Sequence, residues 1–355
     1  MPMVREWLRK ALLISTPCAF CVAALLSVGA SRAAAQADIP IISGGVGFLS
    51  ETNAGATFMQ PVIAPVLTVP LGDRWLIEAR ADLRGFVARQ DGTTGPYQGQ
   101  FFDTLEYLQV DYNAASWLTL TAGRFLTPFD IFNERLSAVW IDKFQDAPII
   151  VPIGTAQGYS DGFMARGALI SRPGYVVNYT TYFSTLSNIN KFESERSTGF
   201  RGGVFFPHAR LELGASYQRL LQSPRANSEG VYWSWQPYEA PLDLKGEWAH
   251  SPGGQGYWIQ SAYRLSHFGG SHSAVGRIEP VFRMQQFVRS MQVLGDFLPA
   301  LDTQRADFGL NYYLPHEVRL NASYSRRFTP GDDANIWAFG ITYRFLLPLW
   351  PGESK

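Results

Sequence analysis

The stretch Ile336-Trp337-Ala338-Phe339-Gly340-Ile341-Thr342-Tyr343-Arg344-Phe345 carries a large apolar or aromatic residue at every odd position from 337 to 345. Successive side chains of a β-strand point to opposite faces, so this pattern predicts a strand with one apolar face and one smaller or more polar face. The alternation recurs along the chain, with no helical segments that would cover the apolar faces. Lipid is the simplest cover, and we expect a protein that crosses a membrane with strands.

Residues 1–36 have the pattern of a secretory signal peptide, because basic residues precede an apolar run at 11–28 and small residues follow it. We expect this segment to be removed. Both cysteines, Cys18 and Cys21, fall within it, so the mature chain contains none.

The composition excludes several classes of protein. With 46% hydrophobic residues, 14% aromatic residues and 33 Gly, the chain is too polar for helical spans and too aromatic for a disordered chain. No stretch after residue 36 approaches the roughly 20 apolar residues that a spanning helix needs. Without the signal peptide, 26 basic and 29 acidic residues remain. A nucleic-acid-binding protein would be expected to be basic.

Short turns rich in Gly, Pro, Asn and Asp alternate with longer irregular segments, as in outer-membrane barrels. We predict an all-β fold, a transmembrane antiparallel β-barrel of about 16 strands with long outer loops and short periplasmic turns. The even count returns both termini to the periplasm. The predicted strands are 41–49, 58–69, 75–89, 102–112, 117–125, 159–170, 174–184, 197–206, 209–219, 229–236, 241–249, 256–266, 277–289, 303–314, 318–328 and 335–345. The barrel would occupy residues 37–345, and residues 346–355 would form a C-terminal tail.

Alternation also predicts which side chains face the lumen. Charged residues at a lipid-facing midplane cost about 2–4 kcal/mol for each Arg or Lys, so the charged face of each strand is expected to point inward. A barrel of this size leaves an aqueous channel. The pore-lining candidates are Arg80, Arg84, Arg166, Arg201, Lys245, Arg264, Arg277, Arg283, Arg305, Arg319, Glu78, Asp82, Asp111, Glu247, Glu279 and Asp307. Basic rings favour anions, but a wall of ion pairs that sets only the width of the pore is an equal alternative.

The longest gap between predicted strands is residues 126–158. Its apolar run at 149–153 is unusual for an exposed loop, and folding into the lumen would bury it and narrow the channel. The alternative is a loop that covers the mouth or joins a subunit contact. If it folds inward, its constriction residues are Phe129, Asp130, Asn133, Glu134, Arg135 and Lys143.

Residues 117–134, where alternating Leu and Thr lead into Gly123-Arg124-Phe125 and Pro128-Phe129, resemble the phosphate-selective porin O and P family. The resemblance extends loosely to residues 307–324. It implies a sixteen-stranded channel and a homotrimer, for which we expect contacts at 41–69 and 335–345. The lysine ladder of that family is absent here, where the mature chain holds only Lys143, Lys191, Lys245 and Lys355.

The expected function is that of an outer-membrane porin, a water-filled channel for passive diffusion of small hydrophilic solutes, with a weak anion preference or none. One alternative is a barrel that sheaths or anchors a partner protein such as a periplasmic electron carrier. Another is a soluble secreted β-sandwich. No enzyme activity and no cofactor or metal is expected, since the His residues fall mostly in turns without a nucleophile or a ligand cluster.

The expected location is the outer membrane of a Gram-negative bacterium, as a multi-pass barrel. The expected partners are outer-membrane lipid and lipopolysaccharide, small anionic or polar solutes and the barrel-assembly machinery, with no nucleic acid. The machinery is included because residues 340–345 resemble its C-terminal recognition signal, although ten residues follow Phe345.

Overall fold

The computed structural model describes residues 39–349 except 91, 93, 156–157, 187–195, 223–224, 271–272 and 294. The predicted signal peptide and residues 350–355 lie outside this part of the chain.

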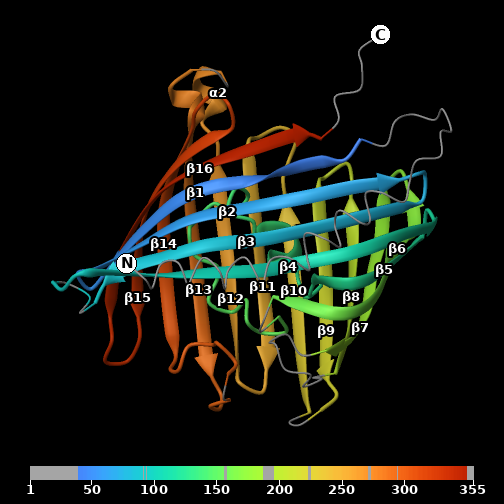
Figure 1. Ribbon diagram of the computed structural model, residues 1–355, viewed down its shortest axis with the longest axis horizontal. Coiled ribbons are helices and arrows are strands. Elements are labelled where there is room, and N and C mark those ends of the chain that lie inside the picture. The colour runs from blue at the N-terminus through green and yellow to red at the C-terminus, as the bar shows by residue number, and fades with distance from the viewer. Residues whose placement is uncertain are drawn as a thin grey trace, which may run out of the picture. The chain divides into compact units, whose positions relative to one another are not determined.

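Sixteen strands form one closed antiparallel barrel in the described part of the chain, in sequence order around the ring (Figure 1). The predicted fold class is confirmed. The strands are β1 (Ile41–Asn53), β2 (Ala56–Leu71), β3 (Trp75–Arg89), β4 (Tyr97–Ala115), β5 (Leu118–Leu126), β6 (Tyr159–Arg172), β7 (Tyr175–Leu186), β8 (Ser197–Phe206), β9 (Leu211–Leu220), β10 (Ala226–Trp235), β11 (Leu242–Ser251), β12 (Gly254–Tyr263), β13 (Ile278–Arg289), β14 (Thr303–Tyr313), β15 (Val318–Phe328) and β16 (Ala334–Pro348).

The first and last strands close the barrel. They pair antiparallel from Ile41 opposite Pro348 to Asn53 opposite Ile336. Strand β16 therefore runs three residues past Phe345, further than the alternation in the sequence indicated. Among the described residues, no helix is both long enough and apolar enough to cross a membrane.

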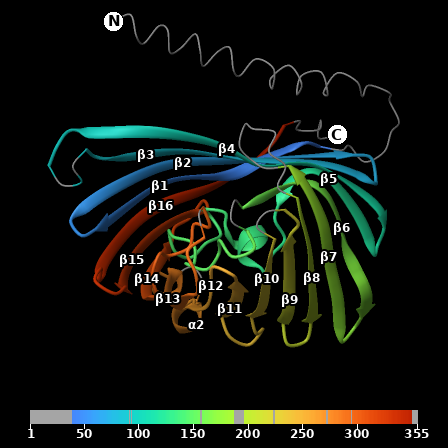
Figure 2. The ribbon, with the colours of Figure 1, turned by 90° about the horizontal axis from the view of Figure 1, so that it is seen from below.

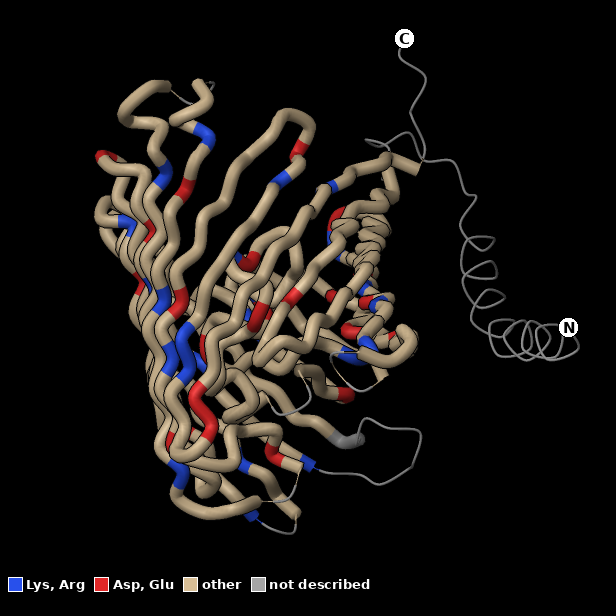
Figure 3. Tube along the Cα trace, turned by 90° about the vertical axis from the view of Figure 1, so that its left-hand side faces the viewer, with Lys and Arg blue, Asp and Glu red and all other residues tan. Residues whose placement is uncertain are grey.

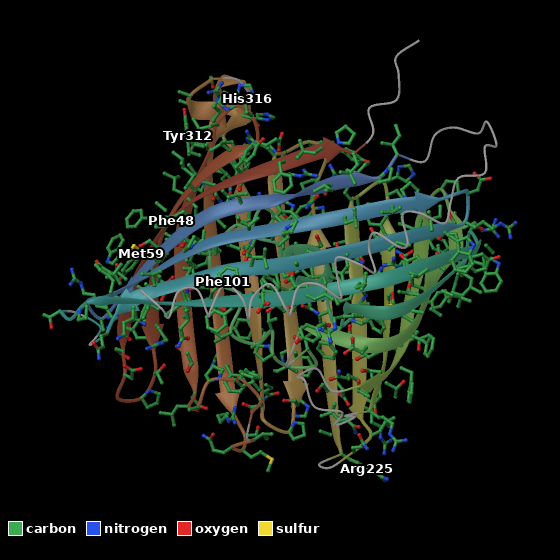
Figure 4. All side chains as sticks on the ribbon, in the orientation of Figure 1. Phe48, Met59, Phe101, Arg225, Tyr312 and His316 are labelled. Carbon is green, nitrogen blue, oxygen red and sulfur yellow. The ribbon has the colours of Figure 1, made fainter. Side chains whose placement is uncertain are left out.

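The outside of the barrel exposes large apolar side chains, and its interior holds polar ones, which is the reverse of a soluble protein. On β16, Trp337 and Phe339 are 51% and 56% exposed, whereas Ile336 and Ala338 face the lumen and are buried. Phe48 and other large apolar side chains likewise project outward from the wall (Figure 4). Inward positions hold the polar and charged residues, many of them buried. This arrangement suits a barrel with lipid outside and a polar interior.

The two ends of the barrel differ in their connections. Tyr312 and His316 mark the end with the short turns, and Arg225 lies at the opposite end (Figure 4). The connection between β12 and β13 is the long exception at the first end, where it contains the short helices α2 (Ser266–Gly269) and η2 (Val275–Arg277).

The gaps at 50–57 and 250–255 between predicted strands, expected to be outer loops, are tight turns instead. The strands β1 and β2 are joined by Ala54 and Gly55 alone, with φ values of 48° and 85°, a backbone suited to a two-residue hairpin. Residues 250–255 likewise contain only the turn at Pro252-Gly253, because β11 continues to Ser251 and β12 starts at Gly254. The polar residues near the tips of these hairpins resemble loop residues in sequence, although they pair with the neighbouring strand up to the turn.

A bulge changes the alternation between β3 and β4. The register shifts between Arg80 and Ala81, where Arg80 pairs with Tyr107 and Ala81 with Leu105. Glu106 is the extra residue, and a bulge of this kind moves every later side chain of the strand to the other face.

Candidate functional site

The segment between β5 and β6 lies inside the barrel. Figure 2 views the barrel from below relative to Figure 1, and it shows this segment within the ring of strands. It includes one π-helical turn, η1 (Phe132–Leu136). We call residues 127–158 the inner loop. Its two ends meet, because Thr127 N donates to Gly158 O at 3.1 Å.

The first part of the inner loop is hydrogen-bonded to the wall at β9 and β11. Asp130 N donates to Ser216 Oγ at 2.8 Å. The backbone nitrogens of Ile131 and Phe132 both donate to Glu247 Oε1 at 2.7 Å, and Trp258 Nε1 donates to the other oxygen of Glu247. The Glu247 carboxylate thus holds the start of η1 by charge-assisted hydrogen bonds.

The second part of the inner loop is bound to β13, β14 and β15. Lys143 forms an ion pair with Glu279 at 2.8 Å. Its carbonyl oxygen accepts hydrogen bonds from Asn311 and Asn321. Further along, Ile149 N donates to Gln285 Oε1 at 2.9 Å.

An apolar cluster lies between the inner loop and the wall. Phe129, Phe132, Ile150 and Ile153 are buried against Ala249, Trp258 and Phe287 of β11, β12 and β13. The apolar run at 149–153 is therefore packed inside the barrel. Burying side chains of this size stabilises a protein by about 1.5–3 kcal/mol each.

Inward glycines leave room for side chains of the inner loop. A Cβ at Gly45 would overlap the ring of Trp140, and one at Gly309 would meet Phe144. Gly340 lies in the same way beneath Gln145. The wall of β1, β14 and β16 is thus shaped to the loop at close range.

A buried ion-pair network fixes the same region. Arg283 pairs with Asp307, and both side chains are fully buried. Arg305 forms ion pairs with Asp307 and with Asp146 of the inner loop, each at 2.6 Å. Arg283 Nη1 also donates to the Asp146 carbonyl oxygen.

On the opposite side of the lumen, along β3 to β8, the inner loop leaves space between itself and the wall. An outer cavity of about 350 Å³ is lined there by residues of the wall and of the loop. Arg166 pairs with Asp111 at 2.9 Å, and Asp111 also accepts from Thr121. Arg201 pairs with Glu134 and donates to the Asp130 carbonyl oxygen at 2.8 Å.

A second, inner cavity of about 330 Å³ lies toward β8 to β11 and is lined by Arg135, Arg210, Glu212 and Lys245, among others. Lys245 is held by Asp243 at 2.9 Å. Basic and acidic positions are interspersed along the strands (Figure 3).

Most candidate residues on the strands lie at inward positions beside the inner loop or the two cavities. Arg80 pairs with Glu106 and donates to Ser137 Oγ of the loop. Arg84 pairs with Asp82, and Glu78 accepts from Gln109. Arg319 donates to the carbonyl oxygen of Val139 at 2.9 Å.

Two candidates lie outside the strands on which they were expected. Arg277 ends the 3-10 turn η2, because β13 begins one residue later at Ile278. Arg264 follows the end of β12 and lies over the ring of Tyr313, with 4.2 Å from its Cζ to the ring centroid.

Several residues at the site were not among the candidates. Glu106 was missed because the bulge interrupts the alternation, and Asp142, Asp146 and Ser137 because an irregular loop has no period. Tyr232 was missed because its polar role depends on Glu212 across the strand pair.

Asp142 is a buried carboxyl group of the inner loop. Burial raises the pKa of Asp142 from 3.8 to about 6, although Arg283 and Arg319 act in the opposite direction. Burial also raises the pKa of Asp130, with the charge of Glu247 adding to the effect. Both acids of the loop therefore favour their protonated forms more than a free aspartate does.

Known protein structures share this fold. The chain matches Salmonella typhi OmpF in complex with daunomycin with a TM-score of 0.57 at 14% identity, covering 86% of this chain and 97% of that one. Vibrio cholerae OmpT lacking loop L8 matches at 0.56 and 8% identity, covering 87% and 100%. The low-pH structure of Pseudomonas putida OprB matches at 0.54 and 9%, covering 87% and 92%. No family model and no curated protein sequence matches the chain.

The chain thus has the fold of the outer-membrane porins of Gram-negative bacteria, a β-barrel that crosses the membrane with all sixteen strands.

Proposed function

We propose that the protein is a porin, which forms a water-filled channel for passive diffusion of small hydrophilic solutes across the outer membrane and prefers anions weakly. The passage lies between the inner loop and the wall from β3 to β10. The porin-type fold and the two polar cavities beside the loop support a channel.

Unequal exposure within the ion pairs of the passage carries the anion preference. In two pairs of the passage the arginine is much more exposed than its carboxylate: Arg135 is 40% exposed against 13% for Glu212, and Arg166 37% against 3% for Asp111. In the pairs Arg201–Glu134 and Lys245–Asp243 the carboxylate is the more exposed partner, but at only 14% and 19%. The most exposed charges among these four pairs are therefore guanidinium groups, although the two signs are nearly balanced in number. Exposed cations along a pore favour anions.

Reversal potentials test this proposal. The purified protein is inserted into planar bilayers between two concentrations of KCl. We expect discrete conductance steps. We also expect a reversal potential shifted from zero toward the equilibrium potential of chloride. Strong cation selectivity would contradict the preference, and bilayers that stay closed would contradict the channel itself.

The alternative of a sheath for a partner protein fits the lumen poorly. The apolar cluster around Phe129 and Ile150, together with the Arg283–Asp307 network, fills one side of the barrel with the chain's own residues. The two cavities beside the inner loop, of about 350 and 330 Å³, suit small solutes.

A homotrimer within the membrane is also part of the proposal. It is supported by the family resemblance and by the apolar outward faces of β1, β2 and β16, which carry Phe48, Ile63 and Trp337. Mass measurement in detergent tests it, because one barrel or three per particle differ threefold in mass. A single barrel would overturn this part of the proposal.

A further inference from the structure

Arg135 lies where the two cavities of the passage meet. It lines the outer cavity together with Arg166 and Glu78, and it also lines the inner cavity together with Arg210 and Lys245. It lies within the π-helical turn η1, whose start is fixed by Glu247. This guanidinium therefore borders both cavities, where a solute moving between them would meet it.

The Arg135 side chain is held from the wall. Arg135 Nη1 donates to Glu212 Oε2 at 2.6 Å, and the Tyr232 hydroxyl donates to Glu212 Oε1 at 3.2 Å. The Tyr232 ring lies close over Gly203 and Gly214, where any Cβ would overlap it. Strands β8, β9 and β10 thus position the tyrosine, which orients the carboxylate, which in turn orients the arginine.

The other cations near this point are less available to a solute. The side chains of Arg201 and Lys245 are 10% and 6% exposed, because Glu134 and Asp243 pair with them. Arg166 lines only the outer cavity and Arg210 only the inner one. Among the described residues that line the two cavities, Arg135 is the exposed cation common to both.

We propose that Arg135 is the specificity-determining residue of the channel, and that Glu212 and Tyr232 are positioning residues that hold it across the passage. This rests on the proposed channel function and deepens it. The solutes that it would favour are small anions with planar oxygen groups, above all monocarboxylates, because a guanidinium matches a carboxylate in shape and charge.

The test compares two variants that each lose one positive charge. Arg135→Gln removes the cation of the passage, and Arg326→Gln removes an arginine that pairs with Asp333 near the outer end of β15. In a KCl gradient we expect the chloride-to-potassium permeability ratio to fall about tenfold for Arg135→Gln, because a unit charge some 6 Å from an ion in water changes the chloride and potassium permeabilities about threefold each, in opposite directions. Arg326→Gln should behave as the wild type. When potassium acetate replaces KCl, the acetate-to-potassium permeability ratio of Arg135→Gln should fall by at least as much.

Tyr232→Phe separates positioning from a structural role. It leaves every charge in place and removes only the hydroxyl that contacts Glu212. If Tyr232 positions Arg135, the permeability ratio falls part of the way toward that of Arg135→Gln. A change in heat stability alone, with an unchanged ratio, would overturn its positioning role.

A cysteine at position 135 provides a second test that does not depend on the glutamine variant folding. The mature chain is expected to contain no other cysteine, so Arg135→Cys can be labelled at this position alone with methanethiosulfonate reagents. A cationic reagent should restore the anion preference, and an anionic one should reverse it. Conducting channels whose reversal potential responds to none of these changes would overturn the role of Arg135. A wild-type protein that forms no channel would instead overturn the proposed function.

Discussion

Arg283 and Asp307 form an ion pair across β13 and β14 that is fully buried in the lumen, with Arg283 Nε donating to Asp307 Oδ2 at 2.8 Å. Gln285 and Arg305 donate to the same carboxylate at 2.6 Å each. The interior of this barrel is therefore partly a packed core and only partly a water-filled channel.

Asp307→Asn should destabilise the barrel strongly. It leaves the guanidinium of Arg283 buried without its counter-charge, a change that costs about 3–5 kcal/mol. Urea unfolding in lipid vesicles measures the free energy of unfolding. The matched control is Asp333→Asn in the exposed pair with Arg326, which should cost under about 1 kcal/mol. Equal losses in the two variants would contradict a buried network.

Gly45→Ala should disturb the inner loop. Its methyl group would overlap the ring of Trp140, and forcing extra volume into a packed site costs about 1–3 kcal/mol. We expect a lower unfolding temperature and a noisier open-channel current. Gly174→Ala is the control, because a Cβ there meets no atom within 4 Å. An equal effect at both glycines would show that the loop does not depend on this contact.

Excision of the inner loop should widen the channel. Thr127 and Gly158 are hydrogen-bonded neighbours, so residues 130–153 can be replaced by a short glycine-serine linker. We expect a larger unitary conductance and a weaker anion preference. Stability should fall, because the excision removes Phe132, Ile150 and Ile153 from the apolar cluster, and each contributes about 1.5 kcal/mol or more. An unchanged conductance would place the narrowest point elsewhere.

Titration of Asp142 should make the free energy of unfolding depend on pH. The folded protein holds this proton more tightly than the unfolded chain does, with a pKa of about 6 against the ordinary 3.8. Stability should therefore fall as the pH rises from about 4 to about 6, and this contribution should then stay constant. Asp142→Asn should remove that slope and gain about 3 kcal/mol at pH 7. An unchanged slope in the variant would assign it to another group.

The alternation of residue types was enough to predict sixteen strands and the inward face of most of them. On β14, for example, it placed Asp307 and Asn311 inward and Phe308 outward, as the structure has them. It could not predict partners, since the pairing of Asp307 with Arg283 depends on the register between strands.

Where the period breaks, prediction from the sequence failed. The bulge at Arg80 hid Glu106. Arg277 was placed on a strand, but Gly276 N donates to Ser273 Oγ, and this contact extends the preceding turn. The contacts of the inner loop were beyond prediction, because each joins an irregular segment to a strand far along the chain.

The inner loop binds strands that are made long after it. Gln145 donates to Asn321, which lies 176 residues further along the chain, and Ile149 depends on Gln285 in the same way. A chain on its way through the periplasm therefore carries this apolar segment before its partners exist, and contacts so distant in sequence form slowly. The loop can take its final place only when the last strands arrive, so a protease cut within residues 127–158 would distinguish unfinished barrels from finished ones.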